Sequence, residues 1–529
     1  MSRTTRRVLR TELLRGTAPM AAATMAVAGP VMLFDDTEEW AGRWASLAEY
    51  VRVLLIVLIP LVVAAGAWQA GRERRGLDGA VPASRPVLRR RRTGRTGGGV
   101  AMSRTTRSVL RTEVLRSAAP AAAVITLVLG ALMVYSEASG WSGRWMPFAA
   151  SVRNSFLILA PVVVATGAWQ AGRERRRRIR EQLAATARPG WQPLVTTWAA
   201  VTLGAMAGLL VVIAAGAALV APIATYAGGG WWWVLAVAIP AIAAMSALGV
   251  AVGRAVPFRL TAPVAAIVTY SLLVYAHDDA GRLYGATWLA PILARFGGGH
   301  TRFDWQLSFQ QGLWFVGLAA TALVVAGARR KWVALVPAAV AAAGAAPLLG
   351  GPPYPTVRVD PAASEVVCTD DEPEVCVTRR DAFLLDDVTG PAREFLARFD
   401  GVPGGPTRAV SMPADDGSDD TLMLDLFPQE ITLTGTLKVS DRVPVARWRP
   451  ELGCDEREDV WRRHHGTLAI AEQWAIGAPH RWGEPDVAEA VEALLATPEP
   501  DQKEWMGELI EAARTCDTRK LSELREQLE

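Results

Sequence analysis

Hydrophobic residues along this chain are grouped into nine long runs, which are separated by shorter polar segments. A helix needs roughly 17–25 residues to cross the hydrocarbon core of a bilayer, and the runs are about that long. They cover residues 17–34, 51–70, 118–135, 155–171, 196–221, 231–252, 261–276, 312–328 and 332–349. This pattern predicts an all-α polytopic membrane protein with about nine transmembrane helices.

Beyond residue 350 the pattern becomes that of a water-soluble domain. Short alternating runs at 407–412, 421–426 and 431–439 predict the strands of a small sheet, and the segments 391–399 and 457–529 look helical. Two apolar helix faces are expected, one formed by Val487, Val491, Leu494 and Leu495, the other by Trp505, Leu509, Ile510 and Ala513. We therefore expect an α+β domain at 351–529.

The first two hydrophobic runs are repeated further along the chain. Residues 1–75 and 102–176 align without a gap and are identical at 42 of 75 positions. Each copy has a basic stretch, an apolar run, a Trp-x-Gly-Arg-Trp loop, a second apolar run and an arginine cluster. This order predicts a duplicated two-helix hairpin at 1–75, a disordered basic Pro/Gly/Arg linker at 76–101 and a seven-helix membrane domain at 102–350.

The distribution of charge predicts an orientation. With nine spans, the arginine-rich segments at 3–15, 72–95, 104–116, 173–188, 254–259 and 329–331 all fall on one side, which is then cytoplasmic. The loops at 35–47, 136–150, 225–230 and 277–311 fall on the other side. The chain from residue 352 is acidic, with 19 Lys and Arg against 37 Asp and Glu. We expect a bacterial plasma-membrane protein with a cytoplasmic N-terminus and an extracytoplasmic C-terminal domain.

The four cysteines all lie in the predicted exterior domain. They are Cys368, Cys376, Cys454 and Cys516. An even number confined to an oxidising side favours disulfides, which can pair in three ways, whereas four unpaired buried thiols are the alternative.

The sequence contains no recognisable catalytic or cofactor-binding motif. There is no P-loop, so any ATP hydrolysis is expected in a partner. The tail histidines match no zinc-binding spacing and are expected on a solvated helix face, and the acidic run at 415–420 lacks the last ligand of a calcium loop. These histidines are His464, His465 and His480, with Glu472 nearby. We therefore predict no enzyme activity, metal or cofactor. We also predict no nucleic-acid partner, because the arginines lie where membrane topology places them.

Ionisable residues are almost absent from the predicted spans. Arg52 and Arg153, at equivalent positions in the two copies, are expected to extend to the outer membrane surface. A transporter driven by protons or sodium ions is therefore disfavoured. Small residues such as Gly204, Gly208 and Gly249 predict close helix packing instead.

An amphipathic helix is predicted before the third hydrophobic run. Its apolar face contains Val109, Leu110 and Val114, and its basic face Arg104, Arg107 and Arg111. It could dock a cytoplasmic partner, or serve only as a topology anchor in contact with lipid.

From residue 102 to about 399 the chain resembles the permease subunits of ABC-2-type exporters, in particular large actinobacterial membrane proteins. The amphipathic entry helix at 103–116, the hairpin ending in GAWQAGR at 167–173 and the small-residue-rich spans carry the resemblance. The tail resembles the extracytoplasmic domains of such proteins in its Cys368-x7-Cys376 element, the helix at 391–399 and the Val-Pro-Gly at 402–404.

The resemblance implies a cytoplasmic ABC ATPase as partner, a homodimer or a second permease subunit, and export of a hydrophobic or amphiphilic substrate. Members of the family usually have six spans, whereas seven follow residue 102 here. The alternative is a membrane-anchored sensor or binding protein that acts through its exterior domain without transport.

Overall fold

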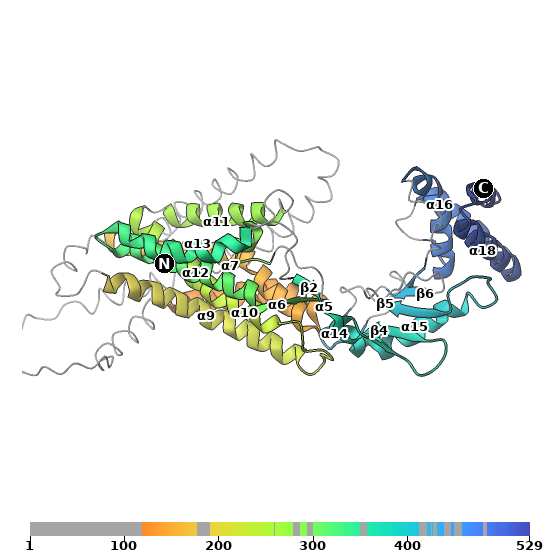
Figure 1. Ribbon diagram of the computed structural model, residues 1–529, viewed down its shortest axis with the longest axis horizontal. Helices are drawn as coiled ribbons and strands as arrows, with labels where there is room; N and C mark the ends of the chain where they lie inside the picture. The colour runs from red at the N-terminus through yellow and green to blue at the C-terminus, as the bar shows by residue number, and fades with distance from the viewer. Residues whose placement is uncertain are drawn as a thin grey trace, which may run out of the picture.

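The computed structural model has a helical bundle at one end and a smaller mixed domain at the other (Figure 1). The structure describes residues 119–176, 191–258, 260–278, 286–293, 300–349, 357–411, 421–424, 426, 431–437, 446–448, 458–479 and 484–528. Below, the bundle is the part from α4 to α13, and the tail domain is the part from β2 onward. Each has its own hydrophobic core.

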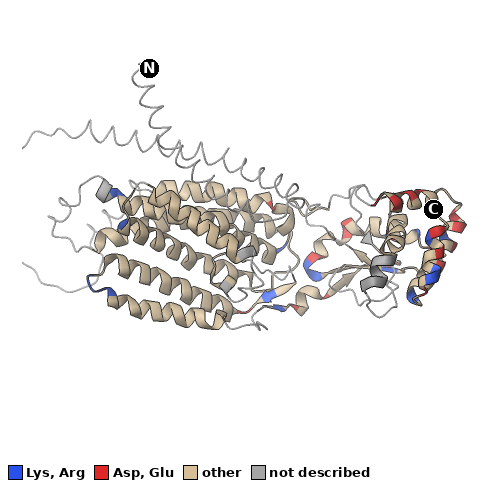
Figure 2. Cartoon of the chain, turned by 90° about the horizontal axis from the view of Figure 1, so that it is seen from above, with Lys and Arg blue, Asp and Glu red and all other residues tan. Residues whose placement is uncertain are grey.

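Six helical segments of the bundle are long and apolar enough to cross a membrane, judged by length and composition. They are α4 (Ala119–Ser136), the pair α6 (Trp145–Asn154) and α7 (Phe156–Arg176), α9 (Gln192–Val220), α10 (Trp231–Ala255), α12 (Trp305–Gly327), and the pair η2 (Lys331–Ala334) and α13 (Leu335–Leu349). A seventh helix, α11 (Thr261–Asp278), has a shorter apolar part. The bundle helices carry few charged residues (Figure 2).

Each of the seven runs predicted from residue 118 onward coincides with one of these helices. The runs at 17–34 and 51–70, the linker at 76–101 and the amphipathic helix at 103–116 lie outside the described residues. Nine spans, and the side of the membrane on which each end lies, therefore remain predictions.

Two predicted loops are partly helical. Within 136–150, the short helix α5 (Ala138–Trp141) and the start of α6 replace the expected loop, and the second span begins at Trp145. Helix α12 begins at Trp305 rather than at 312, because its polar first turns remain helical and Gln311 is buried among neighbouring helices.

Backbone-to-backbone packing joins α4 to α9 and α7 to α10. A side chain on Gly249 or Gly253 of α10 would collide with the backbone carbonyls of Val164 and Ala168 in α7. Gly204 and Gly208 of α9 meet α4 in the same way. The predicted packing through small residues is confirmed at these positions.

The tail domain is built on a mixed five-stranded sheet. Its strands are β3 (Val366–Cys368), β4 (Val375–Thr378), β5 (Arg408–Ser411), β6 (Thr421–Leu424) and β7 (Ala446–Arg447), which lie in this order. Strands β4, β5 and β6 run parallel, the edge strands are antiparallel to their neighbours, and α15 (Leu385–Ala397) connects β4 to β5. A small sheet is confirmed, but the sequence predicted only β5 and β6 of these strands.

Beyond β7 the described residues form four helices, as the helical pattern predicted. They are α16 (Glu458–Ile476), α17 (Pro485–Leu495), α18 (Glu499–Arg514) and α19 (Thr518–Glu526). Val487, Val491 and Leu494 of one predicted face are buried, as are Trp505 and its partners on the other. These helices share one core with the sheet and α15.

Candidate functional site

The bundle and the tail domain meet at a junction formed by residues far apart in the sequence. On the bundle side, the loop between α5 and α6 carries the Trp-Ser-Gly-Arg-Trp motif at 141–145. The Trp141 indole is buried and donates a 2.7 Å hydrogen bond from Nε1 to the Val134 carbonyl, and Trp145 stacks on Trp231 with ring centroids 4.3 Å apart. The two tryptophans therefore fix both ends of the loop to the bundle.

Between these tryptophans the chain turns toward the tail domain. Gly143 has φ +70°, a conformation that glycine adopts without steric cost. The Phe383 ring of the tail lies so close that a Cβ on Gly143 would be 2.7 Å from Cζ. Arg144 follows, with its guanidinium carbon 5.9 Å from the centre of the same ring. Only glycine fits this turn against Phe383.

A buried ion pair joins the two sides. Arg144 Nε lies 2.6 Å from Asp381 Oδ1, and their side chains are 3% and 2% exposed. Asp381 also accepts a 2.6 Å hydrogen bond from Arg380 Nη2 and a 3.2 Å bond from the Thr378 hydroxyl. The carboxylate is thus shared by two guanidinium groups, one from each side of the junction.

The two guanidinium groups lower the pKa of Asp381. Burial acts to raise the pKa of the Asp381 carboxyl, but the guanidinium groups of Arg144 and Arg380 outweigh burial and lower it to about 2. The carboxylate is therefore charged throughout the physiological pH range.

His300, in the segment before β1 (Thr301–Phe303), contacts the same network. Its Nε2 lies 3.1 Å from the Thr378 hydroxyl and its Nδ1 3.3 Å from Arg380 Nη1. Burial, followed by the charge of Arg380, lowers the pKa of His300 to about 4. The ring is neutral at pH 7, and accepting a hydrogen bond from Arg380 assigns the proton to Nε2, which donates to Thr378.

Further contacts widen the junction. The Tyr226 hydroxyl donates a 2.5 Å hydrogen bond to Asp360 Oδ2, and Thr225 Oγ1 donates a 2.8 Å bond to the Arg379 carbonyl. Strand β1 pairs with β2 (Val357–Val359), which opens the tail domain. Desolvation, together with Asp360, raises the pKa of Tyr226 to about 12, so this hydroxyl stays protonated and donates.

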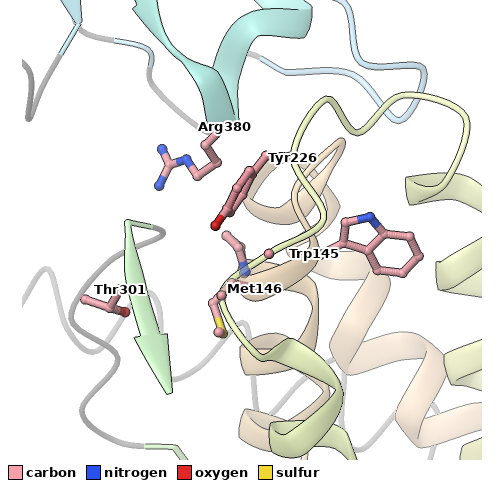
Figure 3. A pocket seen from close by; sticks show the side chains of 8 residues that line it. Trp145, Met146, Tyr226, Thr301 and Arg380 are labelled. Atoms are coloured by element: carbon pink, nitrogen blue, oxygen red, sulfur yellow. The ribbon is translucent and has the colours of Figure 1, made fainter. Parts of the chain in front are cut away.

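A small pocket lies within the junction (Figure 3). It is lined by residues of both sides, including Met146, Tyr226, Gly229, Thr301 and Arg380, and has space for about one water molecule. This volume is too small for an organic substrate. The junction is therefore built to hold two parts of the protein together.

A second buried arginine lies inside the bundle. Arg153 of α6 is 1% exposed and donates to the Pro291 carbonyl at 2.7 Å, the Val234 carbonyl at 3.3 Å and Gln311 Oε1 at 3.4 Å. Gln311 in turn donates to the Trp288 carbonyl at 2.8 Å. The prediction that Arg153 extends to the membrane surface is wrong, because three acceptors within the bundle hold its guanidinium.

The cysteine predictions can be checked in part. Cys368 and Cys376 are directly opposite in the β3–β4 ladder and form a disulfide. Cys516 is also disulfide-bonded, while Cys454 lies outside the described residues. Among the described residues, the group that could supply metal ligands is Cys368, Glu374 and Cys376, and its sulfurs are used by the disulfide.

Other predicted site residues are not brought together. The docking helix with Arg104, Arg107, Val109, Leu110, Arg111 and Val114 lies outside the described residues, as do the acidic run at 415–420 and His480. His464 is only 4% exposed and therefore lies on the buried side of α16. The expectation of a solvated helix face is wrong for this residue.

The sequence pattern does not predict the junction residues. One signal could have found them: the Trp-x-Gly-Arg-Trp loop occurs in both copies, at 40–44 and 141–145, within a stretch where many neighbours differ. Trp141, Gly143 and Arg144 all have specific contacts in the structure.

No family model, curated protein or solved structure matches this chain.

Proposed function

We propose that this chain is a permease-like membrane subunit of an ABC-type exporter, powered by a separate ATPase and acting on a hydrophobic or amphiphilic substrate. In this proposal nine spans cross a bacterial plasma membrane, the arginine-rich ends face the cytoplasm, and the tail domain lies outside. The subunit works as a homodimer or with a second permease subunit.

The observation that carries the proposal is that α6 and α7 run from the junction with the tail domain to an arginine-rich end. Together they form one 29-residue candidate span, Trp145–Arg173. Its first residue follows Arg144, which is paired with Asp381 of the tail. Its last residue is Arg173, and the end of α7 adds Arg175 and Arg176. A movement at either end of this span would be passed to the other, as a transporter driven from the cytoplasmic side requires.

The test is affinity purification of the full chain from its own membranes in a mild detergent, with proteins identified by mass spectrometry. The proposal predicts that an ATPase with a P-loop is retained, and that a non-hydrolysable nucleotide increases its retention. Absence of any such ATPase, from a preparation in which the junction is intact, would count against transport.

A second candidate is a sensor or binding protein that uses the bundle as an anchor. It is favoured by the glycine contacts between α7 and α10, where backbone meets backbone and leaves little room for movement. In this case the tail domain would bind its ligand with the same affinity whether or not nucleotide and ATPase are present.

A further inference from the structure

Three basic residues follow one another at the turn between α12 and η2. They are Arg329, Arg330 and Lys331, and all three are exposed. Helix α12 ends at Gly327, and the backbone is extended at Ala328 and Arg330 before η2 begins at Lys331. These three basic residues are called the basic turn below.

No carboxylate of the described residues pairs with the basic turn: none of its three side chains has an ion pair or a hydrogen bond there. The neighbouring helices α9, α12 and α13 contain no Asp or Glu. The negative C-terminus of α12 and the positive N-terminus of the η2–α13 pair meet at the turn, so their partial charges of about half a unit each largely cancel. The basic turn therefore keeps its positive charge.

The basic turn lies at the end of the bundle farthest from the tail domain. Helix α12 begins at Trp305, next to β1 at the junction, and its 23 residues span about 35 Å. Figure 2 shows Lys and Arg residues at this far end, with helices between the two ends that are almost free of charge. Since the hydrocarbon core of a bilayer is about 30 Å thick, the length of α12 places the basic turn in the headgroup region opposite the junction.

Exposed apolar side chains adjoin the basic turn. Trp332 and Leu335, which follow it, are 64% and 69% exposed. Trp191, at the start of α9, is 56% exposed and lies nearby, because Leu194 of α9 packs against Gly327 at the end of α12. Tryptophan side chains prefer the headgroup region of a bilayer, and leucine prefers the acyl chains. A lipid at this position would meet cationic groups at its phosphate and apolar side chains below it.

We propose that the basic turn binds the phosphate groups of anionic phospholipids in the leaflet farthest from the tail domain, with Trp332 and Trp191 between the headgroups. Guanidinium groups donate paired, charge-assisted hydrogen bonds to phosphate oxygens. An anionic lipid would offset the charge of the turn, whereas a zwitterionic lipid brings a cation of its own. The exposed apolar residues beside the turn favour a lipid over an acidic protein surface. This inference does not depend on the transport function.

The test measures the thermal unfolding midpoint of the full chain in an uncharged detergent. A short-chain phosphatidylglycerol is titrated, with the matching phosphatidylcholine and inorganic phosphate in parallel. Phosphatidylglycerol should raise the midpoint, while phosphatidylcholine and inorganic phosphate at the same concentrations should not. If inorganic phosphate alone reproduces the shift, or phosphatidylcholine matches it, the assignment to an anionic lipid is overturned.

The variant replaces all three residues of the basic turn with glutamine. The control replaces Lys503, Arg519 and Lys520 of α18 and α19 with glutamine, which changes the net charge of the chain equally but leaves the bundle intact. Each basic residue near an anionic surface increases association roughly five-fold, so the variant should bind phosphatidylglycerol roughly 100-fold more weakly. The control should bind as the wild type does. An unchanged response in the variant, or an equal loss in the control, overturns the proposal.

A measurement on the wild-type chain does not rely on any variant. Raising the ionic strength to about 1 M shortens the Debye length to about 3 Å and should remove most of the phosphatidylglycerol-dependent shift. A shift that persists unchanged at high salt would show that the acyl chains alone are bound, and would refute the role of the basic turn. If the variant keeps the lipid response but loses a protein that copurifies with the wild type, the turn docks a protein and the lipid assignment is overturned.

Discussion

Replacing Asp381 with asparagine should open the junction more than replacing its partner Arg144 with methionine. Asp381→Asn leaves two guanidinium groups, from Arg144 and Arg380, facing each other without a counter-charge. Removing one partner of a buried ion pair costs about 3–5 kcal/mol, and we take about 4 kcal/mol for this variant. After Arg144→Met, Asp381 keeps Arg380 at 2.6 Å, so only one charged hydrogen bond is lost, at about 2 kcal/mol.

The assay is hydrogen–deuterium exchange at the junction. The Asp360 amide donates a 2.7 Å hydrogen bond to the His300 carbonyl across the interface, so its exchange reports undocking. Since about 1.4 kcal/mol is a factor of ten, exchange should become roughly several hundred-fold faster in Asp381→Asn and roughly 30-fold faster in Arg144→Met. Amides of α17, in the tail core, serve as the internal control and should be unchanged.

Two results would refute this reasoning. If Arg144→Met opened the junction as much as Asp381→Asn, the carboxylate would not be shared as the geometry indicates. If neither variant changed exchange at Asp360, docking would not depend on the ion pair.

Four further predictions concern His300, Gly143, Arg153 and residues 1–101. The pKa of His300 is lowered to about 4, below its usual 6.5, so the unfolded chain binds a proton between these values and the folded one does not. The protection factor of the Asp360 amide, which compares its exchange rate with that of an unstructured amide at the same pH, should therefore fall as pH falls from 6.5 to 4, and His300→Gln should flatten this dependence. Gly143→Ala should destabilise docking by at least about 1–2 kcal/mol through its positive φ alone, measured by the same exchange, whereas Gly390→Ala, with open space around it, should not. Arg153→Met should lower bundle stability by about 3 kcal/mol in denaturant titrations, because carbonyls lose their buried donor. Deleting residues 1–101 should leave membrane insertion and orientation, mapped by labelling of introduced cysteines, unchanged, and loss of insertion would show that the first hairpin is required.

The hydrophobic pattern predicted the bundle well because long apolar runs leave few structural options. Every run from residue 118 onward became a helix, with errors at the ends. Helix α12 begins seven residues earlier than predicted. The predicted run stops short of Gln311 because glutamine is polar, although this side chain is buried in the bundle and accepts a hydrogen bond from Arg153. A polar residue with a distant partner gives no local sign of burial.

The tail sheet was harder to predict. Strands β5 and β6 lie within runs that the sequence indicated as strands, whereas β4 is a short, fully buried strand, Val375–Thr378, outside any such run. The disulfide between Cys368 and Cys376 was one of three possible pairings until the β3–β4 register placed the two residues opposite each other.

The junction could not be predicted from local patterns at all. Arg144 and Asp381 are 237 residues apart in the sequence, and each has the surroundings of an ordinary surface residue. The Trp-x-Gly-Arg-Trp pattern occurs in both copies of the hairpin, but only the tertiary structure shows that Phe383 and Asp381 are the partners of the second copy.

The central claim is that the tail domain and the span α6–α7 are coupled within a powered transporter. The most direct test is the ATP hydrolysis rate of the purified complex between the full chain and the ATPase that the proposed function requires, compared for wild type and Asp381→Asn. The account predicts that the variant still binds the ATPase but hydrolyses ATP at a clearly different rate, because its tail is undocked. Equal rates in a variant shown by hydrogen exchange to be undocked would contradict the coupling.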